Sequence, residues 1–226
     1  MGGYCDAPWA REIEKLPPNV NYVFTPERND ANIGSDFGKK ETAGKKEEFP
    51  YLMAELGGGL QPTKHRRPVA SAADIGAMSL VKLGCGANLL GYYMYHGGSN
   101  PEGRNTTLQE TKKTGSWNEL PAYNYDFQAP VGEYGQVRES CREIKLLSMF
   151  LHDFGSGLCT MKPEFPSPVM DDAGNLETLR TCVRHNGERG YLFVNNYQRL
   201  YPMKEHRNAV LYAKIGTNEL YYPARD

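Results

Sequence analysis

A glutamate, Glu55, is the residue of this sequence best placed to do chemistry. It follows Pro50–Ala54, a short and almost wholly apolar run typical of a strand buried on both faces of a parallel sheet. Enzymes of the α/β barrel type keep their catalytic groups at the carboxyl ends of such strands. A surface glutamate that merely starts a loop fits the same pattern, so the position alone leaves both roles open.

A second apolar run, Ala87–Tyr95, also ends in polar and aromatic residues. Two adjacent strands that end in such groups would build one rim. The candidates from this run are Tyr93, Tyr95, His96 and Asn100.

Aromatic side chains are concentrated in and after this second run. Rings with polar tips offer flat apolar faces together with hydrogen bonds, which suits a sugar or another polyhydroxylated ligand in a concave pocket. For any single ring, packing of a long loop is the more ordinary role, so the argument depends on the whole group. The group consists of Tyr92, Tyr93, Tyr95, Trp117, Tyr123, Tyr125, Phe127 and Tyr134.

Local signals predict a βαβ unit that carries both runs. Gly57–Gly59 must form a turn after the first run. Ser71–Asp74 has the pattern of a capping box, which opens a helix that closes at Gly84. A buried strand, a helix and a second buried strand in this order are typical of a parallel sheet.

A further helix and a set of antiparallel strands are predicted after residue 135. An amphipathic helix is predicted over 136–151, with Gly155 ending it. Farther on, two runs around a turn at 186–187 predict a β-hairpin, followed by more antiparallel strands. We therefore expect an α/β part over 1–155, then a linker and the start of a β-rich domain over 156–226. Two parallel strands do not complete a sheet, so the α/β part is expected to be incomplete.

The composition indicates a globular protein without a nucleic-acid or membrane partner. The 226 residues carry 26 Lys+Arg against 27 Asp+Glu, a formal net charge of -1 at pH 7, which gives no basic field for phosphates. No run approaches the roughly 20 apolar residues that span a bilayer, and the N-terminus lacks signal-peptide features. The 5 scattered cysteines are expected to be free thiols.

Neither a metal nor a nucleotide cofactor is expected. The 5 histidines fall in separate elements without the spacing of zinc ligands. Gly84, Gly86 and Gly91 lack the spacing of a dinucleotide loop, and they precede a strand where that loop would follow one.

Three segments resemble the glycoside hydrolase family 35 β-galactosidases. Residues 93–100, YMYHGGSN, are similar to the family segment Y-M-x-H-G-G-T-N, with a conservative serine for threonine. Residues 125–135, YDFQAPVGEYG, are similar to the family segment Y-D-Y-D-A-P-L-x-E-x-G farther along the chain. Residues 50–59 are similar to the family strand whose end supplies the catalytic nucleophile, which maps to Glu55.

This resemblance implies the last strands and helices of a (β/α)8 TIM barrel, followed by the beginning of an all-β domain. It implies hydrolysis of terminal β-galactosides by a retaining mechanism, in which one glutamate forms a covalent glycosyl-enzyme and another protonates the leaving oxygen. Glu55 is then the nucleophile. The implied sugar-site residues are Tyr93, Tyr95, His96, Asn100 and Tyr125.

The resemblance also implies that the chain is a fragment of the catalytic domain. The family's acid/base glutamate follows an asparagine at the end of an earlier strand, and no Asn-Glu pair precedes Glu55. Residues 51–153 would supply only the last two βα units of a barrel that typically needs about 250 residues. The isolated chain is therefore expected to be inactive.

Three departures from the family pattern affect the expected sugar pocket. Leu56–Gly59 replaces a family P-G-W, Phe127 stands where the family often has a tyrosine, and Gln128 replaces an aspartate. Two alternatives to a β-galactosidase stay open. One is a non-catalytic carbohydrate-binding module in which Glu55 only hydrogen-bonds a glycan, and the other is a different exo-β-glycosidase.

Overall fold

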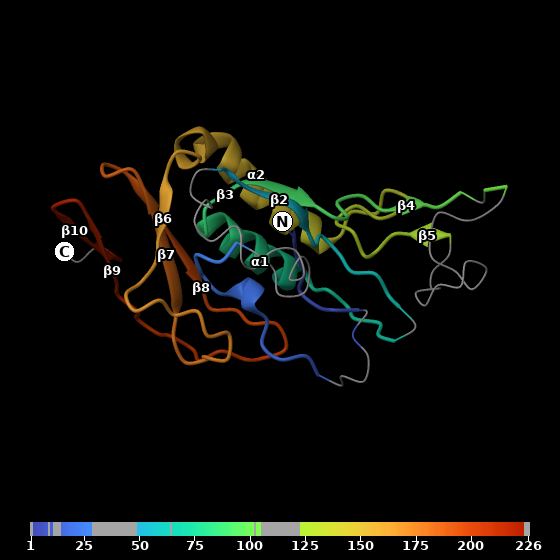
Figure 1. Cartoon of the computed structure of the whole chain (residues 1–226), viewed down its shortest axis with the longest axis horizontal. Coiled ribbons are helices and arrows are strands. Elements are labelled where there is room, and N and C mark those ends of the chain that lie inside the picture. The colour runs from blue at the N-terminus through green and yellow to red at the C-terminus, as the bar shows by residue number, and fades with distance from the viewer. Residues whose placement is uncertain are drawn as a thin grey trace.

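The computed structural model describes residues 2–8, 10, 15–28, 49–63, 65–101, 103–104 and 123–223. Trp117, one of the eight aromatic residues named above, lies outside the described residues. Within them, a parallel sheet covered by helices lies beside a set of antiparallel strands (Figure 1).

A three-stranded parallel sheet carries the candidate site. Its strands β1 (Gly2–Gly3), β2 (Tyr51–Leu56) and β3 (Ala87–Tyr92) pair in this order. A short 3-10 helix, η1 (Val20–Tyr22), follows β1, and helix α1 (Ala72–Gly84) connects β2 to β3. The predicted βαβ unit is therefore confirmed, including the capping box at the start of α1 and the end of α1 at Gly84.

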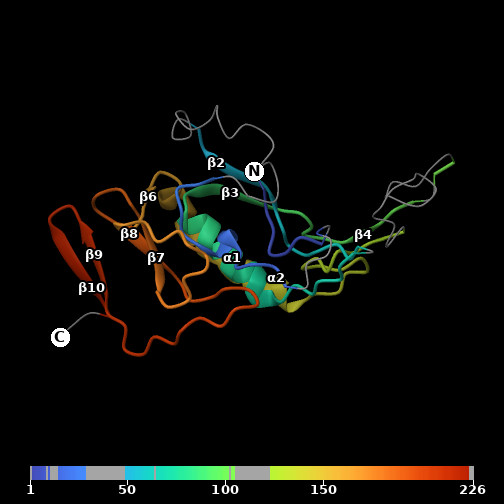
Figure 2. The same cartoon turned by 60° about the horizontal axis from the view of Figure 1, so that its bottom comes forward.

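A second helix, α2 (Glu139–Leu158), packs against α1 on the same side of the sheet (Figure 2). The predicted end of this helix at Gly155 is wrong, because the helix continues for three more residues. A glycine inside a helix costs only about 1 kcal/mol. Leu158 is 1% exposed and packs in the core, which holds the last turn in place.

The face of the parallel sheet away from the helices is open. Leu52 and Leu89 are 46% and 48% exposed, whereas Tyr51 and Met53 pack in the core on the helix side and are 1% and 0% exposed. The prediction that these strands are buried on both faces is therefore wrong. In the described part of the chain the sheets are small and not closed, so the partial (β/α)8 barrel stays a prediction.

Antiparallel strands form the other part of the molecule. Strands β6 (Lys162–Glu164), β7 (Arg180–His185) and β8 (Gly190–Asn195) make one sheet, in which β7 and β8 confirm the predicted hairpin. Strands β9 (Leu211–Ile215) and β10 (Asn218–Tyr222) confirm the further antiparallel strands. A third pair, β4 (Gly98–Ser99) and β5 (Asn124–Tyr125), lies at the opposite end of the molecule (Figure 1).

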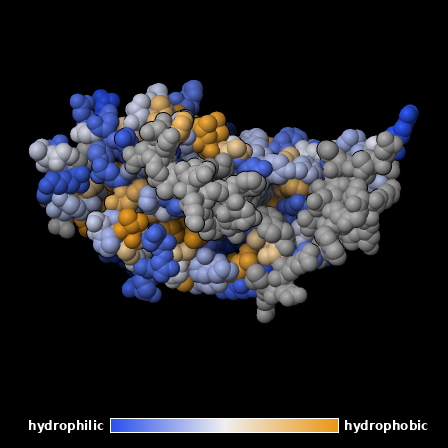
Figure 3. Space-filling view, in the orientation of Figure 1, coloured by the Kyte–Doolittle hydropathy of each residue, from blue (hydrophilic) through white to orange (hydrophobic). Residues whose placement is uncertain are grey.

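The surface of the antiparallel part is mixed in character. Hydrophobic patches lie between hydrophilic ones on the face shown in Figure 3. Tyr212, Leu220 and Tyr222 of the β9–β10 hairpin are each more than half exposed, at 51%, 51% and 70%. No helix within the described ranges is both long enough and apolar enough to cross a membrane.

A buried arginine of β7 joins the two parts. Arg184 is 1% exposed and donates hydrogen bonds to the carbonyl oxygens of Leu83 (3.0 Å), Ala87 (3.1 Å), Leu158 (2.8 Å) and Met161 (3.1 Å). The last carbonyls of a helix have no partner within it, and this guanidinium supplies partners at the ends of both helices. The predicted division near residue 155 stays a prediction, and the core crosses it.

Replacing Arg184 is expected to destabilise the fold strongly. Arg184→Met should lower the free energy of unfolding by about 3 kcal/mol or more, because it removes every hydrogen bond that the buried guanidinium donates to these four carbonyls. Urea unfolding followed by circular dichroism measures the change. Arg189→Met, at an exposed position of the β7–β8 turn, is the control, and an equal loss in both variants would contradict the role given to Arg184.

The cysteines should differ sharply in reactivity, because three of the five are buried free thiols. Burial raises the pKa of Cys5 to about 12, and it also raises the pKa values of Cys85 and Cys182. These three thiols stay protonated at pH 8, and the thiolate is the reactive form. Iodoacetamide at pH 8 should therefore modify exposed Cys159 first, and should reach the buried three only in denaturant, as mass spectrometry of the peptides would show.

Candidate functional site

Glu55 is turned out of the core by a β-bulge. The register pairs Met53 with Leu90 and Leu56 with Tyr92, so β2 has one more residue than β3 between these pairs. Met53 and Leu56 are both 0% exposed, and the extra residue leaves Glu55 partly exposed between them. Bulges re-aim side chains and are common beside active sites. With regular alternation after Met53, Glu55 would have faced the helices.

A tyrosine of the neighbouring strand end contacts this carboxylate. The Tyr4 hydroxyl donates to Glu55 Oε2 at 3.4 Å. The tyrosine is 8% exposed, and its own carbonyl accepts hydrogen bonds from the side chains of Asn19 (2.8 Å) and Asn21 (3.0 Å). Hydrogen bonds therefore hold Tyr4 at its side-chain hydroxyl and at its main-chain carbonyl. Sequence reasoning missed it, because a two-residue strand gives no hydrophobic periodicity.

Three aromatic rings lie together beside Glu55. The centroids of Tyr125 and Phe127 are 4.2 Å apart, and Tyr93 lies 6.3 Å from Tyr125 and 6.2 Å from Phe127. Partial burial raises the pKa of Tyr125, and the negative charge of Glu55 raises it further. The backbone of Tyr93 is hydrogen-bonded to Leu56 (2.9 Å) and Gly58 (3.3 Å), which places these rings next to the end of β2. We call Tyr93, Tyr125 and Phe127 the aromatic group below.

The loop after Glu55 has no room for side chains. A Cβ on Gly57 would lie 2.7 Å from the Tyr4 ring, one on Gly58 2.2 Å from the Met94 carbonyl oxygen, and one on Gly59 2.1 Å from the Phe127 carbonyl oxygen. Real Cβ atoms essentially never approach other atoms so closely. The glycines therefore let the loop pack backbone to backbone against the segments that carry the aromatic group.

The other predicted site residues lie elsewhere. Tyr95 lies on the helix side, where its hydroxyl is 3.9 Å from Cys141 Sγ on α2. His96 is exposed, and its ring Nδ1 contacts the carbonyl oxygen of the next residue, Gly97. Asn100 is 6% exposed, beside the β4–β5 pair. The structure therefore brings together Glu55, Tyr93 and Tyr125, and it does not bring Tyr95 or His96 to Glu55.

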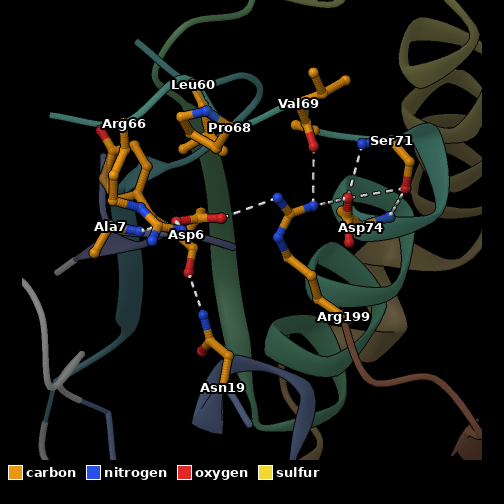
Figure 4. Close-up of polar contacts among 12 residues, drawn as sticks. Asp6, Ala7, Asn19, Leu60, Arg66, Pro68, Val69, Ser71, Asp74 and Arg199 are labelled. Carbon is orange, nitrogen blue, oxygen red and sulfur yellow. Dashed lines mark hydrogen bonds and ion pairs between the residues drawn. The ribbon is translucent and has the colours of Figure 1, made fainter. Parts of the chain in front are cut away.

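A buried ion-pair network begins at Asp6, two residues after Tyr4 in the chain (Figure 4). Arg199, 8% exposed, donates to Asp6 Oδ2 at 2.9 Å and also to Asp74 Oδ2. Arg66 donates to the other oxygen of Asp6 at 2.9 Å. Two arginines and two aspartates balance in charge, which makes their burial tolerable. The network ties the segment that begins with Tyr4 to the start of α1.

The site offers a ligand one carboxylate, one tyrosine hydroxyl and aromatic rings. Among the residues that the structure describes, no group of three or more His, Cys, Asp or Glu side chains could hold a metal ion. A half-exposed carboxylate at the carboxyl end of a parallel strand, with a hydroxyl and three rings beside it, can accept a ligand with both apolar faces and hydroxyls.

No protein-family model matches this sequence, and no curated protein matches it.

The tight packing of the glycine loop can be tested directly. Gly59→Ala is expected to destabilise the protein by about 2 kcal/mol, because the added methyl group overpacks against the backbone of Phe127 and Gln128. Gly98→Ala is the matched control, since a Cβ there meets nothing within 4 Å. Thermal unfolding of the two variants measures the difference, and similar midpoints would contradict the geometry.

Proposed function

We propose that Glu55 is the catalytic nucleophile of a retaining exo-β-glycosidase, with a terminal β-galactoside as its substrate. The bulge in β2 is the observation that carries the proposal. It places a carboxylate outside the core, at the carboxyl end of a parallel strand, beside a tyrosine hydroxyl and an aromatic group. A structural glutamate at a loop start needs none of these neighbours.

The reaction would proceed in two steps. First, a Glu55 oxygen forms a bond to the anomeric carbon while the bond from that carbon to the leaving oxygen breaks, and a second carboxylic acid protonates that oxygen. Water then attacks the anomeric carbon and gives its proton to the second carboxylate, and Glu55 leaves. In retaining enzymes the two carboxyl groups lie about 5–5.5 Å apart. We assign the second carboxyl group to no residue of this chain.

The open face of the parallel sheet supports the idea that the site is only part of a catalytic domain. Leu52 and Leu89 stand exposed on that face. Parallel sheets are ordinarily covered on both faces. On this proposal, the remaining strands and the acid/base residue of the domain belong to polypeptide beyond the sheet described above.

A mechanism-based label can test the nucleophile without needing the second carboxyl group. A 2,4-dinitrophenyl 2-deoxy-2-fluoro-β-galactoside has a leaving group that departs unprotonated, and its fluorine slows the hydrolysis of the glycosyl-enzyme. The chain should gain one fluorogalactosyl group, and peptide mass spectrometry should place it on Glu55. Glu55→Gln should abolish the label. Glu139→Gln, at an exposed position on α2, should leave it unchanged.

The same preparation should not hydrolyse an alkyl β-galactoside at a measurable rate, since general acid catalysis is worth about 10²–10⁴-fold. Labelling at another residue, or no labelling, would overturn the proposal. Faster labelling by the matching glucoside would assign a different exo-β-glycosidase. Galactose binding that survives Glu55→Gln, together with no labelling, would assign a carbohydrate-binding module instead.

A further inference from the structure

The turn that carries Tyr125 and Phe127 has a strained backbone. Phe127 and Gln128 have φ values of 48° and 58°, in the left-handed region that residues other than glycine rarely adopt. Two consecutive residues in this conformation persist only where their surroundings hold them. Such strain is often found where a site needs a side chain at a particular place.

The Gln128 side chain holds this turn to the loop between β2 and α1. Its Nε2 donates to the carbonyl oxygens of Leu60 (3.0 Å) and Pro68 (2.9 Å), and its Oε1 accepts from the backbone N–H of Ala70 (3.2 Å). One amide group thus joins both ends of the loop that follows the glycines. Only a side chain with donors and an acceptor at this length can make all three bonds.

The rest of the turn is fixed around the same residue. The backbone N–H of Gln128 donates to Asp126 Oδ2 at 3.2 Å, and the same oxygen accepts from Arg138 at 2.7 Å. Gly59 lies against the Phe127 carbonyl with no space for a Cβ. The position of the Phe127 ring, and of the Tyr125 ring packed against it at an angle of 40°, therefore depends on contacts that converge on Gln128.

We propose that Gln128 is a positioning residue that holds the Tyr125 and Phe127 rings in place to bind the sugar that Glu55 attacks. This inference rests on the function proposed above. The hydrogen bonds of Gln128 go to Leu60, Pro68, Ala70 and Asp126 and not to Glu55, so it acts through Phe127 and Tyr125. Its loss should weaken the binding of the sugar ring to the aromatic group more than it slows the attack by the carboxylate.

Two substitutions separate positioning from simple stability. Gln128→Gly removes the three side-chain bonds and relieves the backbone strain, because glycine adopts positive φ freely. Gln128→Glu keeps the size of the side chain but replaces the amide donor with an oxygen that faces two carbonyls. Gln136→Gly, at an exposed position before α2, is the control.

The readout is the rate of Glu55 labelling at increasing fluorogalactoside concentration. Both Gln128 variants should raise the half-saturating concentration about tenfold, the size of one lost ring contact, while the rate at saturation stays close to that of the unsubstituted chain. The control should leave both quantities unchanged. A purely structural role would instead reduce the amount of labelled protein without shifting the half-saturating concentration.

The two proposals fail in different ways. If the unsubstituted chain is not labelled at all, the nucleophile assignment fails. If it is labelled and the Gln128 variants keep its half-saturating concentration, the positioning role fails alone. Should Gln128→Gly not fold, Gln128→Glu decides the question, because it preserves the packing volume.

Discussion

The fold depends on a charge-balanced cluster that is almost completely removed from water. Arg199 lies between Asp6 and Asp74, which are 2% and 1% exposed, and each carboxylate has further partners. Taking one member away would leave an uncompensated charge in a medium of low dielectric constant, which is far costlier than losing a surface ion pair. The cluster therefore requires the segments after β1, before α1 and after β8 to meet in one arrangement.

Two more buried arginines are stabilised by hydrogen bonds to uncharged main-chain carbonyls. Arg184 of β7 supplies donors to the helix ends, and Arg180 of the same strand donates to the carbonyls of Tyr22 and Ala173 at 3.0 and 3.1 Å. Main-chain oxygens at the helix ends and in the loops are thus bonded by side chains from the antiparallel sheet. These hydrogen bonds attach the parallel sheet and its helices, and with them the strand ends that carry the site, to the antiparallel sheet.

Local patterns predicted the elements well and the site only in part. The capping box before α1 and the β7–β8 turn are determined by neighbouring residues, so the sequence is enough to find them. The bulge at Glu55 and the contact from Tyr4 depend on how distant strands align, and no local pattern contains that information. The end of α2 was missed for a similar reason, since burial of Leu158 outweighs the weak helix preference of a glycine.

The predicted rim after β3 fails in part because the alternation of side chains stops where the strand ends. After β3, Tyr93 joins the aromatic group, whereas Tyr95 turns to α2 although it is only two positions away. A strict alternation would have put both on one side. The chain leaves strand geometry after Tyr92, so two residues of a contiguous motif, Tyr93 and Tyr95, contact different parts of the structure.

The glycine loop after Glu55 also limits how this site can change over evolutionary time. Gly57–Gly59 are in contact with backbone or ring atoms, so a side chain at any of these positions would displace a neighbour. Gly59 and the turn that carries Phe127 pack directly against each other, so a change in one segment requires a change in the other. A library aimed at new specificity should therefore diversify the two segments together.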